Sequence, residues 1–153
     1  MIEYIEMDEN GIDQIKALWE KLNEHHRNKT IHFLKRFSNY SFDQRKTMIL
    51  EQASFSKVRI ELAKDFEMNS TVAYCVSSVD SKENGEIVSV FVEESHRKLG
   101  IGGVLMKHAL AWMDEIGVKS KRIDVVYGND EALPFYEKFG FYPLFLVLQQ
   151  KTK

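Results

Sequence analysis

The spacing of apolar and polar residues predicts a chain that begins with a strand and helices. Residues 2–7 alternate apolar and acidic side chains, which is typical of a short strand. From Ile12 to His26 the apolar residues recur at helical spacing, and residues 42–53 again have a helical composition. Residues 27–41 scatter aromatic and aliphatic side chains among basic ones, so a short helix and an ordered loop that covers a site both remain open.

The middle of the chain favours strands. Residues 58–64 alternate strictly, as expected for a strand with one face in the core and one face in water. Residues 69–78 are β-branched and almost uncharged, which predicts a more deeply buried neighbour. The polar residues 80–85 form a turn that leads into the β-branched strand 86–92, so a hairpin is expected.

The last third of the chain combines strands with helices. Residues 101–116 present one continuous apolar face that ends at Gly117, which predicts a helix between the strands 86–92 and 122–127. Such a strand–helix–strand unit requires its two strands to run parallel. The other expected elements are a short helix within 129–139 that stops at Gly140, and a final strand at 141–148.

A glycine-containing turn, Arg97 to Gly103, stands between the strand 86–92 and the following helix. The first amides of a helix have no partner and lie at its positive end, and glycines allow an anion to approach them, so the turn is a candidate phosphate site. Gly100-x-Gly102 begins a dinucleotide fingerprint, but Leu105 occupies the third glycine position, and no Gly-Lys-Ser/Thr follows for a P-loop. A tight turn without a ligand remains an alternative at this point.

Composition and charge limit the domain organisation, the cellular location and the classes of partner. The 153 residues are 44% hydrophobic and 29% charged, which predicts a single soluble domain over residues 1–153, and a net charge of −2 favours no nucleic-acid partner. Cys75 is the only cysteine, the first residues carry acids where an export signal needs basic residues, and no apolar run approaches the roughly 20 residues of a membrane span. We therefore expect a cytoplasmic protein with no membrane partner.

Two motifs in the second half carry a resemblance to a known family. Arg97-x-x-Gly100-x-Gly102 resembles the acyl-CoA signature of the GCN5-related N-acetyltransferases (GNAT), and Asn129-x-x-Ala132-x-x-Phe135-Tyr136-x-x-x-Gly140-Phe141 resembles the second half of that family's core. The likeness covers about residues 86–143. It implies an α/β chain with the GNAT-type acyl-CoA N-acyltransferase fold: a mixed, mostly antiparallel, twisted sheet with two splayed parallel central strands, flanked by helices.

The resemblance implies acetyl-CoA as the acyl donor and no metal. The coenzyme A pyrophosphate should lie on the amides of residues 98–103, the pantetheine arm should pair with Val90–Val92, and the Val90 N–H should point at the thioester carbonyl. The family often has glycine where this chain has Lys98 and proline where it has Glu94. The implied cofactor contacts are Val90, Phe91, Val92, Arg97, Lys98, Leu99, Gly100, Ile101, Gly102, Gly103, Asn129 and Phe135.

The family also implies direct attack of a primary amine on the thioester in a ternary complex. Tyr136 matches the tyrosine that protonates the departing thiolate. Glu86 matches the glutamate that accepts the amine proton in histone-acetylating members, whereas many small-molecule members carry an acid where this chain has Ser89. Glu86 as a solvent-facing residue and a water chain as the base both stay open.

The acceptor is the part that the sequence leaves open. A small molecule, a peptide amino terminus or a lysine would each fit, and a homodimer is an option that relatives suggest. A non-catalytic acyl-CoA-binding module and a nucleotide-binding protein are the alternatives. Aromatic and histidine residues of the first half are the candidates for the acceptor pocket: Trp19, His25, His26, Phe33, Tyr40 and Tyr74.

Overall fold

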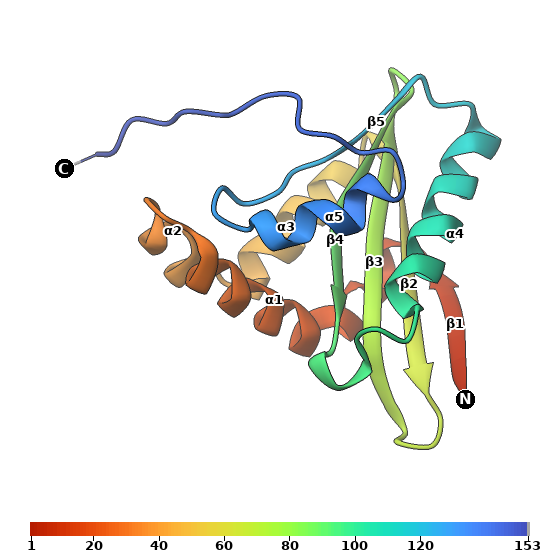
Figure 1. Ribbon diagram of the computed structural model, residues 1–153. Coiled ribbons are helices and arrows are strands. Elements are labelled where there is room, and N and C mark those ends of the chain that lie inside the picture. The colour runs from red at the N-terminus through yellow and green to blue at the C-terminus, as the bar shows by residue number, and fades with distance from the viewer. Residues whose placement is uncertain (153) are drawn as a thin grey trace.

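A five-stranded sheet with the order β1-β2-β3-β4-β5 forms the centre of the molecule in the computed structural model, which describes residues 1–152 (Figure 1). The strands are β1 (Ile2–Met7), β2 (Ser56–Asp65), β3 (Ser70–Asp80), β4 (Asn84–Val92) and β5 (Ser120–Ile123). The α-helices are α1 (Lys16–Lys29), α2 (Leu34–Ser38), α3 (Phe42–Ala53), α4 (Ile101–Ile116) and α5 (Leu133–Glu137), and the 3-10 helices are η1 (Glu9–Ile15), η2 (Glu94–His96) and η3 (Asp130–Ala132).

Helices cover both faces of the sheet, because both faces carry apolar side chains. Helices α1 and α3 pack on one face around a core that includes Trp19, Ile49 and Tyr74. Helix α4 packs on the other face, where Leu105 and Met113 are fully buried (Figure 1). The predicted α/β class with a mixed, mostly antiparallel sheet is confirmed. No helix within residues 1–152 is long and apolar enough to cross a bilayer.

The segment 27–41 contains the end of one helix, a loop and a second, short helix. Helix α1 continues to Lys29, a loop follows, and α2 adds one short helix at 34–38. Helix α3 then begins with a capping box, in which the Ser41 hydroxyl accepts from the Gln44 amide and the Gln44 side chain accepts from the Ser41 amide. The cap fixes where α3 starts and thus which of its side chains face the sheet.

Strand β4 is regular on one side and open on the other. It pairs along its length with β3, except at a bulge where Val88 has no partner. On its other side it pairs in parallel with β5 only between Asn84–Ile87 and Ser120–Ile123. The two parallel strands therefore separate after Ile87, as the sequence resemblance implied.

The carboxy-terminal segment departs from expectation. Residues 141–148 were predicted to form a final strand, but no helix or strand follows α5 within residues 1–152, and β5 ends at Ile123 and not at Tyr127. The strand prediction for 141–148 is therefore wrong, because aromatic and aliphatic residues give a segment strand character but do not supply its partner. As a result the parallel pair lies at one edge of the sheet and not at its centre.

Candidate active site

The open side of β4 offers backbone groups to a ligand. The amide of Glu93 donates to the Val72 carbonyl at 2.7 Å, so this end of β4 alternates between groups that face β3 and groups that face away from it. By that alternation the N–H and C=O groups of Val90 and Val92 point towards the separated β5. An extended ligand with an amide backbone of its own can bind there as an added strand.

The turn before α4 gives a helix N-terminus with free amides. Gly100 is the N-cap with φ of 82°, it has no side-chain cap, and the first turn of α4 carries no acidic residue. Lys98 also lies in the left-handed region, with φ of 66°, where glycine is the favoured residue. The side chain of Leu99 is exposed and that of Ile101 is buried. Both side chains are apolar, so each residue would bind an anion through its backbone amide.

Glycine at position 102 allows a close approach of neighbouring side chains. A Cβ on Gly102 would lie 3.3 Å from the tip of the Phe135 ring and 3.4 Å from a Val92 methyl group. A Cβ on Gly103 would meet only Phe139, at 3.9 Å. Position 102 thus brings the helix start, the end of β4 and Phe135 together, and the uncapped amides beside this close approach fit the pyrophosphate of coenzyme A.

Arg97 and His96 hold the turn in place. The Arg97 Nε donates to the Val92 carbonyl at 3.1 Å, and its guanidinium lies 5.5 Å from the centre of the Phe91 ring. The buried His96 Nε2 lies 2.8 Å from Asp65 Oδ2 at the end of β2, and this hydrogen bond lowers the pKa of Asp65. The turn is therefore fixed to two strands before any ligand binds.

The loop after β5 carries Asn129, the next of the predicted cofactor contacts. Asn129 is buried, and its Oδ1 accepts no hydrogen bond within residues 1–152. The loop is attached to α1: Glu131 pairs with Lys29 at 3.1 Å, and a Cβ on Gly128 would lie 2.2 Å from the Lys29 carbonyl. An unpaired buried amide oxygen is costly, so this one is available for a donor on the ligand.

Tyr136 is embedded among aromatic rings. Its ring packs edge-on against Phe135 at 5.3 Å between centroids, and it lies in the same core cluster as Phe141. Burial raises the pKa of the Tyr136 hydroxyl to about 12, with a smaller contribution from Cys75. A phenol with this pKa stays protonated at neutral pH and can donate a proton.

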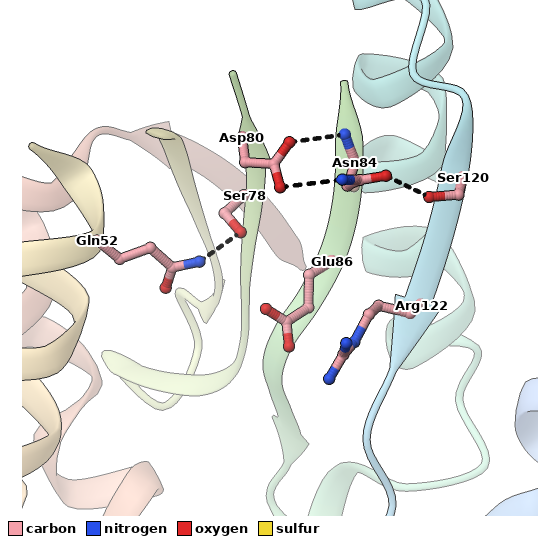
Figure 2. A pocket seen from close by; sticks show the side chains of 8 residues that line it. Gln52, Ser78, Asp80, Asn84, Glu86, Ser120 and Arg122 are labelled. Carbon is pink, nitrogen blue, oxygen red and sulfur yellow. Dashed lines mark hydrogen bonds between the residues drawn. The ribbon is translucent and has the colours of Figure 1, made fainter. Parts of the chain in front are cut away.

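Glu86 lines a cavity of about 430 Å³ between α3 and the sheet. The cavity is lined by Gln52, Ser78, Asp80, Asn84, Gly85, Glu86, Ser120 and Arg122. Figure 2 shows the Glu86 side chain directed into the space between β4 and α3, with Gln52 opposite it. Desolvation raises the pKa of Glu86, and Arg122 opposes that shift. Glu86 is thus a half-buried carboxylate in a polar cavity, and its role as the base stays a prediction.

Sequence reasoning missed the residues of α3 that face this cavity and the bulge. Arg45 donates to the carbonyl of the bulged Val88 at 2.9 Å, and Gln52, two turns later, donates to Ser78 at 2.9 Å. The available signal was the spacing of seven residues, which places two polar side chains on the sheet-facing side of an otherwise amphipathic helix.

The residues predicted for the acceptor pocket lie in different parts of the structure. Trp19 and Tyr40 pack against each other at 5.8 Å in the core cluster under α1, so packing is their main role. Tyr74 is fully buried, and its hydroxyl lies 2.7 Å from Ser89 Oγ on β4. Burial lowers the pKa of His26 to about 4, so this histidine is neutral at pH 7. His25 lies 3.5 Å from Glu131 on the loop after β5.

Comparison with known proteins gives a family match and similar folds. The model of the acetyltransferase (GNAT) family matches residues 17–141. An N-alpha-acetyltransferase from Sulfurisphaera tokodaii is 33% identical over 60 residues, which is 39% of this chain and 36% of that protein. The matched segment thus spans about a third of the length of that curated relative.

Two solved structures illustrate the likeness in fold. A GCN5-related N-acetyltransferase from Ralstonia eutropha JMP134 superposes with a TM-score of 0.76 at 15% identity, over 99% of both chains. The aminoglycoside N-acetyltransferase AAC(6')-Iy in complex with CoA superposes with a TM-score of 0.68 at 16% identity, over 100% of this chain and 95% of that one. At these identities the likeness concerns the fold alone.

Proposed function

The chain belongs to the GNAT acetyltransferase family, and from this premise we propose that it transfers an acetyl group from acetyl-CoA to a primary amine by direct attack in a ternary complex. The observation that carries the proposal is the separation of β4 from β5 immediately before an uncapped helix N-terminus. One feature suits an extended pantetheine arm and the other suits its pyrophosphate, and they follow each other along the chain.

Acetyl-CoA would supply the acetyl group as a thioester, and the residues of this chain would bind it through their backbone. The pyrophosphate would lie on the amides of residues 98–103, and Val90 and Val92 would pair with the arm. Asn129 Oδ1 would accept from a donor of the cofactor, and Phe135 would pack beside it. The Val90 N–H would donate to the carbonyl oxygen, where negative charge develops during attack.

Two side chains would handle the protons. An alkylammonium has a pKa of about 10.4, so the acceptor must lose a proton before it attacks, and Glu86 would take that proton directly or through a water in the cavity. Desolvation raises the pKa of Glu86 and thereby makes it a stronger base than an ordinary glutamate. Tyr136, protonated because its pKa is about 12, would give its proton to the departing thiolate.

The size and polarity of the cavity fit a small amine or the end of a peptide. Its walls carry carboxylate, amide and hydroxyl groups, which can hold an ammonium group and polar neighbours. The names of the similar proteins point to amino termini in one case and aminoglycosides in the other. Both classes present primary amines, so both belong in the acceptor screen.

The test is a screen of amines for thiol release from acetyl-CoA. We expect turnover with at least one primary amine, and acetylation of that amine by mass spectrometry. If coenzyme A stabilises the protein against heat but no amine yields thiol above the background, the protein is the non-catalytic acyl-CoA-binding module. If NAD or ATP stabilises it and coenzyme A does not, the nucleotide-binding alternative holds.

A further inference from the structure

Residues 25–42, the basic segment, carry positive charge without any acidic residue, although the whole chain has 23 acidic residues against 21 Lys and Arg residues. The cations of the segment are Arg27, Lys29, Lys35 and Arg36. Glutamates outside the segment pair with the first two of them. Lys35 and Arg36 are exposed and have no ion-pair partner within residues 1–152. The segment is therefore a local cationic surface on a slightly acidic protein.

The basic segment packs against the loop after β5. The His32 ring stacks on the Tyr127 ring at 6.2 Å between centroids. A Cβ on Gly128 would lie 3.0 Å from a side-chain carbon of Ile31, so the two backbones approach closely there. Figure 1 shows the same neighbourhood, with α2 beside the loop that precedes α5. The segment thus borders the strand opening, the region beyond Ile87 where β4 and β5 no longer pair, on its β5 side.

The basic segment also reaches the β4 side of the strand opening. Burial is the main reason that the pKa of His26 is lowered to about 4, and the charges of His25 and Arg45 add to the shift. Arg45 in turn donates to the carbonyl of Val88 on β4 at 2.9 Å. The segment therefore spans the opening from one strand to the other, in positively charged surroundings.

Helix α2, which carries Lys35 and Arg36, has a fixed position relative to α1. The Asn23 Nδ2 of α1 donates to the Phe37 carbonyl at 2.9 Å and to the Tyr40 carbonyl at 3.3 Å. These bonds hold both ends of the short helix, so its two cations are presented at a defined place and do not sit on a free loop.

The other end of the strand opening, where β4 and β5 still pair, is acidic. Glu86 and Asp80 line the cavity there. The Arg122 guanidinium pairs with both oxygens of Asp124, at 3.0 and 3.1 Å, so its charge is balanced locally. A field of this polarity directs an ammonium group towards the carboxylates and negative charge towards the basic segment.

We propose that the basic segment selects peptide amino termini that are followed by acidic residues. This inference rests on the proposed function and adds the charge of the acceptor to it. The cations are distributed over α1 and α2, so they match several negative charges in succession, as consecutive acidic side chains supply them. Exposed Ile31 and Leu34 lie between the cations in the sequence and give a peptide apolar contacts as well. An acceptor with several positive charges is repelled by the same residues.

The experiment compares three peptide amides that share one amino-terminal residue: Ala-Glu-Glu-Glu-Tyr, Ala-Gln-Gln-Gln-Tyr and Ala-Arg-Arg-Arg-Tyr. Each has a single primary amine, so thiol release from acetyl-CoA reports the same reaction in all three. We expect kcat/KM to be about tenfold higher for the glutamate peptide than for the glutamine peptide, and lowest for the arginine peptide. Salt should reduce these differences, because it screens exposed charges.

A charge-reversed variant, Lys35→Glu with Arg36→Glu, tests the segment itself. We expect it to lose the preference for the glutamate peptide through a higher KM, with kcat unchanged and with a gain for the arginine peptide. Lys16→Glu with Lys107→Glu is the matched control, since both lysines are exposed and neither belongs to the basic segment. The control changes the net charge equally and should keep the wild-type order of peptides.

Binding separates this proposal from the proposed function. Anisotropy of the same peptides with acetylated amino termini and a fluorescent label measures affinity without turnover. If no amine is acetylated but the acetylated glutamate peptide still binds most tightly, the proposed function fails and the charge preference holds. Equal affinity for the three peptides, or an unchanged order in Lys35→Glu with Arg36→Glu, would overturn the proposal. Tighter binding of a single-stranded RNA of equal charge would also overturn it, because the segment would then be a nucleic-acid surface.

Discussion

The candidate site has two regions, one for the cofactor and one for the acceptor. Backbone groups form the first region, and side chains form the second. At the proposed cofactor end the groups that would face the ligand are the backbone groups of Val90 and Val92 and the amides at the start of α4. At the proposed acceptor end they would be the side chains of Glu86, Gln52 and Arg122, from three separate elements. A backbone site tolerates many side-chain changes but no obstruction, whereas a side-chain site responds to the loss of single polar groups.

Gly102→Val should give the largest effect, because it obstructs the backbone site. A Cβ at position 102 already lies 3.3 Å from Phe135, and two more methyl groups would cover the first amides of α4. We expect the affinity for coenzyme A to fall about 1,000-fold, which corresponds to about 4 kcal/mol. Isothermal titration calorimetry measures it.

Gly103→Ala is the matched control, since its Cβ makes only an ordinary contact with Phe139 at 3.9 Å. Its affinity for coenzyme A should stay within threefold of the wild-type value. Equal losses in both variants would mean that the helix start tolerates no side chain at all, and the close approach at Gly102 would lose its special role.

Tyr136→Phe removes the proposed proton donor. We expect kcat to fall about 200-fold, a typical loss for a general acid, while the affinity for coenzyme A changes little because the ring still packs on Phe135. Tyr4→Phe, which keeps the edge-on contact of its ring with His108 at 5.6 Å between centroids, serves as the control and should retain full activity. Unchanged kcat in Tyr136→Phe would remove this tyrosine from the mechanism.

Glu86→Gln tests the acceptor end. Burial raises the pKa of Glu86, so its basic form is lost as the pH falls through a value above the ordinary 4.3 or so of glutamate. We expect kcat/KM to fall about 30-fold at neutral pH, and the pH profile to lose this acidic limb and keep only the limb of the amine. Affinity for coenzyme A should not change.

The exposed Glu115→Gln on α4 is the control for Glu86→Gln and should leave the pH profile intact. An acidic limb that persists in Glu86→Gln would assign the proton to another group. The water chain, which the sequence left open, would then be the stronger reading.

The contrast between the two ends also explains what the sequence could predict. The proposed cofactor end follows from local patterns, because a strand, a glycine turn and a helix start are consecutive in the chain. The structure brings Val92, Gly102 and Phe135 together there. The acceptor end joins α3 to β3, β4 and β5, so Gln52 and Arg122 could not be placed without the fold.

Whether a helix or a strand could be predicted also depended on whether it needs a second segment. Helix α4 was predicted from its own apolar face and ends where Gly117 adopts φ of 87°. The segment 141–148 has strand-like residues, but a strand needs a neighbour, and its own chain does not present one along its path. Strand identity is thus a property of two segments, and one segment alone determines only the propensity.

Arg45→Met should give a smaller loss, because Arg45 acts on the backbone site through a side chain. The variant removes the 2.9 Å hydrogen bond to the carbonyl of Val88, at the bulge that precedes the Val90 N–H. As a positioning effect we expect about a tenfold decrease in kcat with little change in coenzyme A affinity. Arg45→Lys, which keeps the charge and a donor, should recover part of it, and a loss confined to KM for the amine would instead indicate that Arg45 contacts the acceptor.

Lys98→Gly should give the smallest effect, and it separates backbone from side chain at the cofactor end. Lys98 has φ of 66°, so glycine relieves strain of about 1 kcal/mol, but it loses part of that gain through greater freedom in the unfolded chain. We expect a net stabilisation of about 0.5 kcal/mol by thermal unfolding. The exposed Lys107→Gly inside α4 should instead destabilise by about 1 kcal/mol. If the backbone alone binds the pyrophosphate, coenzyme A affinity stays constant in Lys98→Gly; a tenfold decrease would show that the ammonium group also holds the cofactor, and the division between a backbone end and a side-chain end would have to be redrawn.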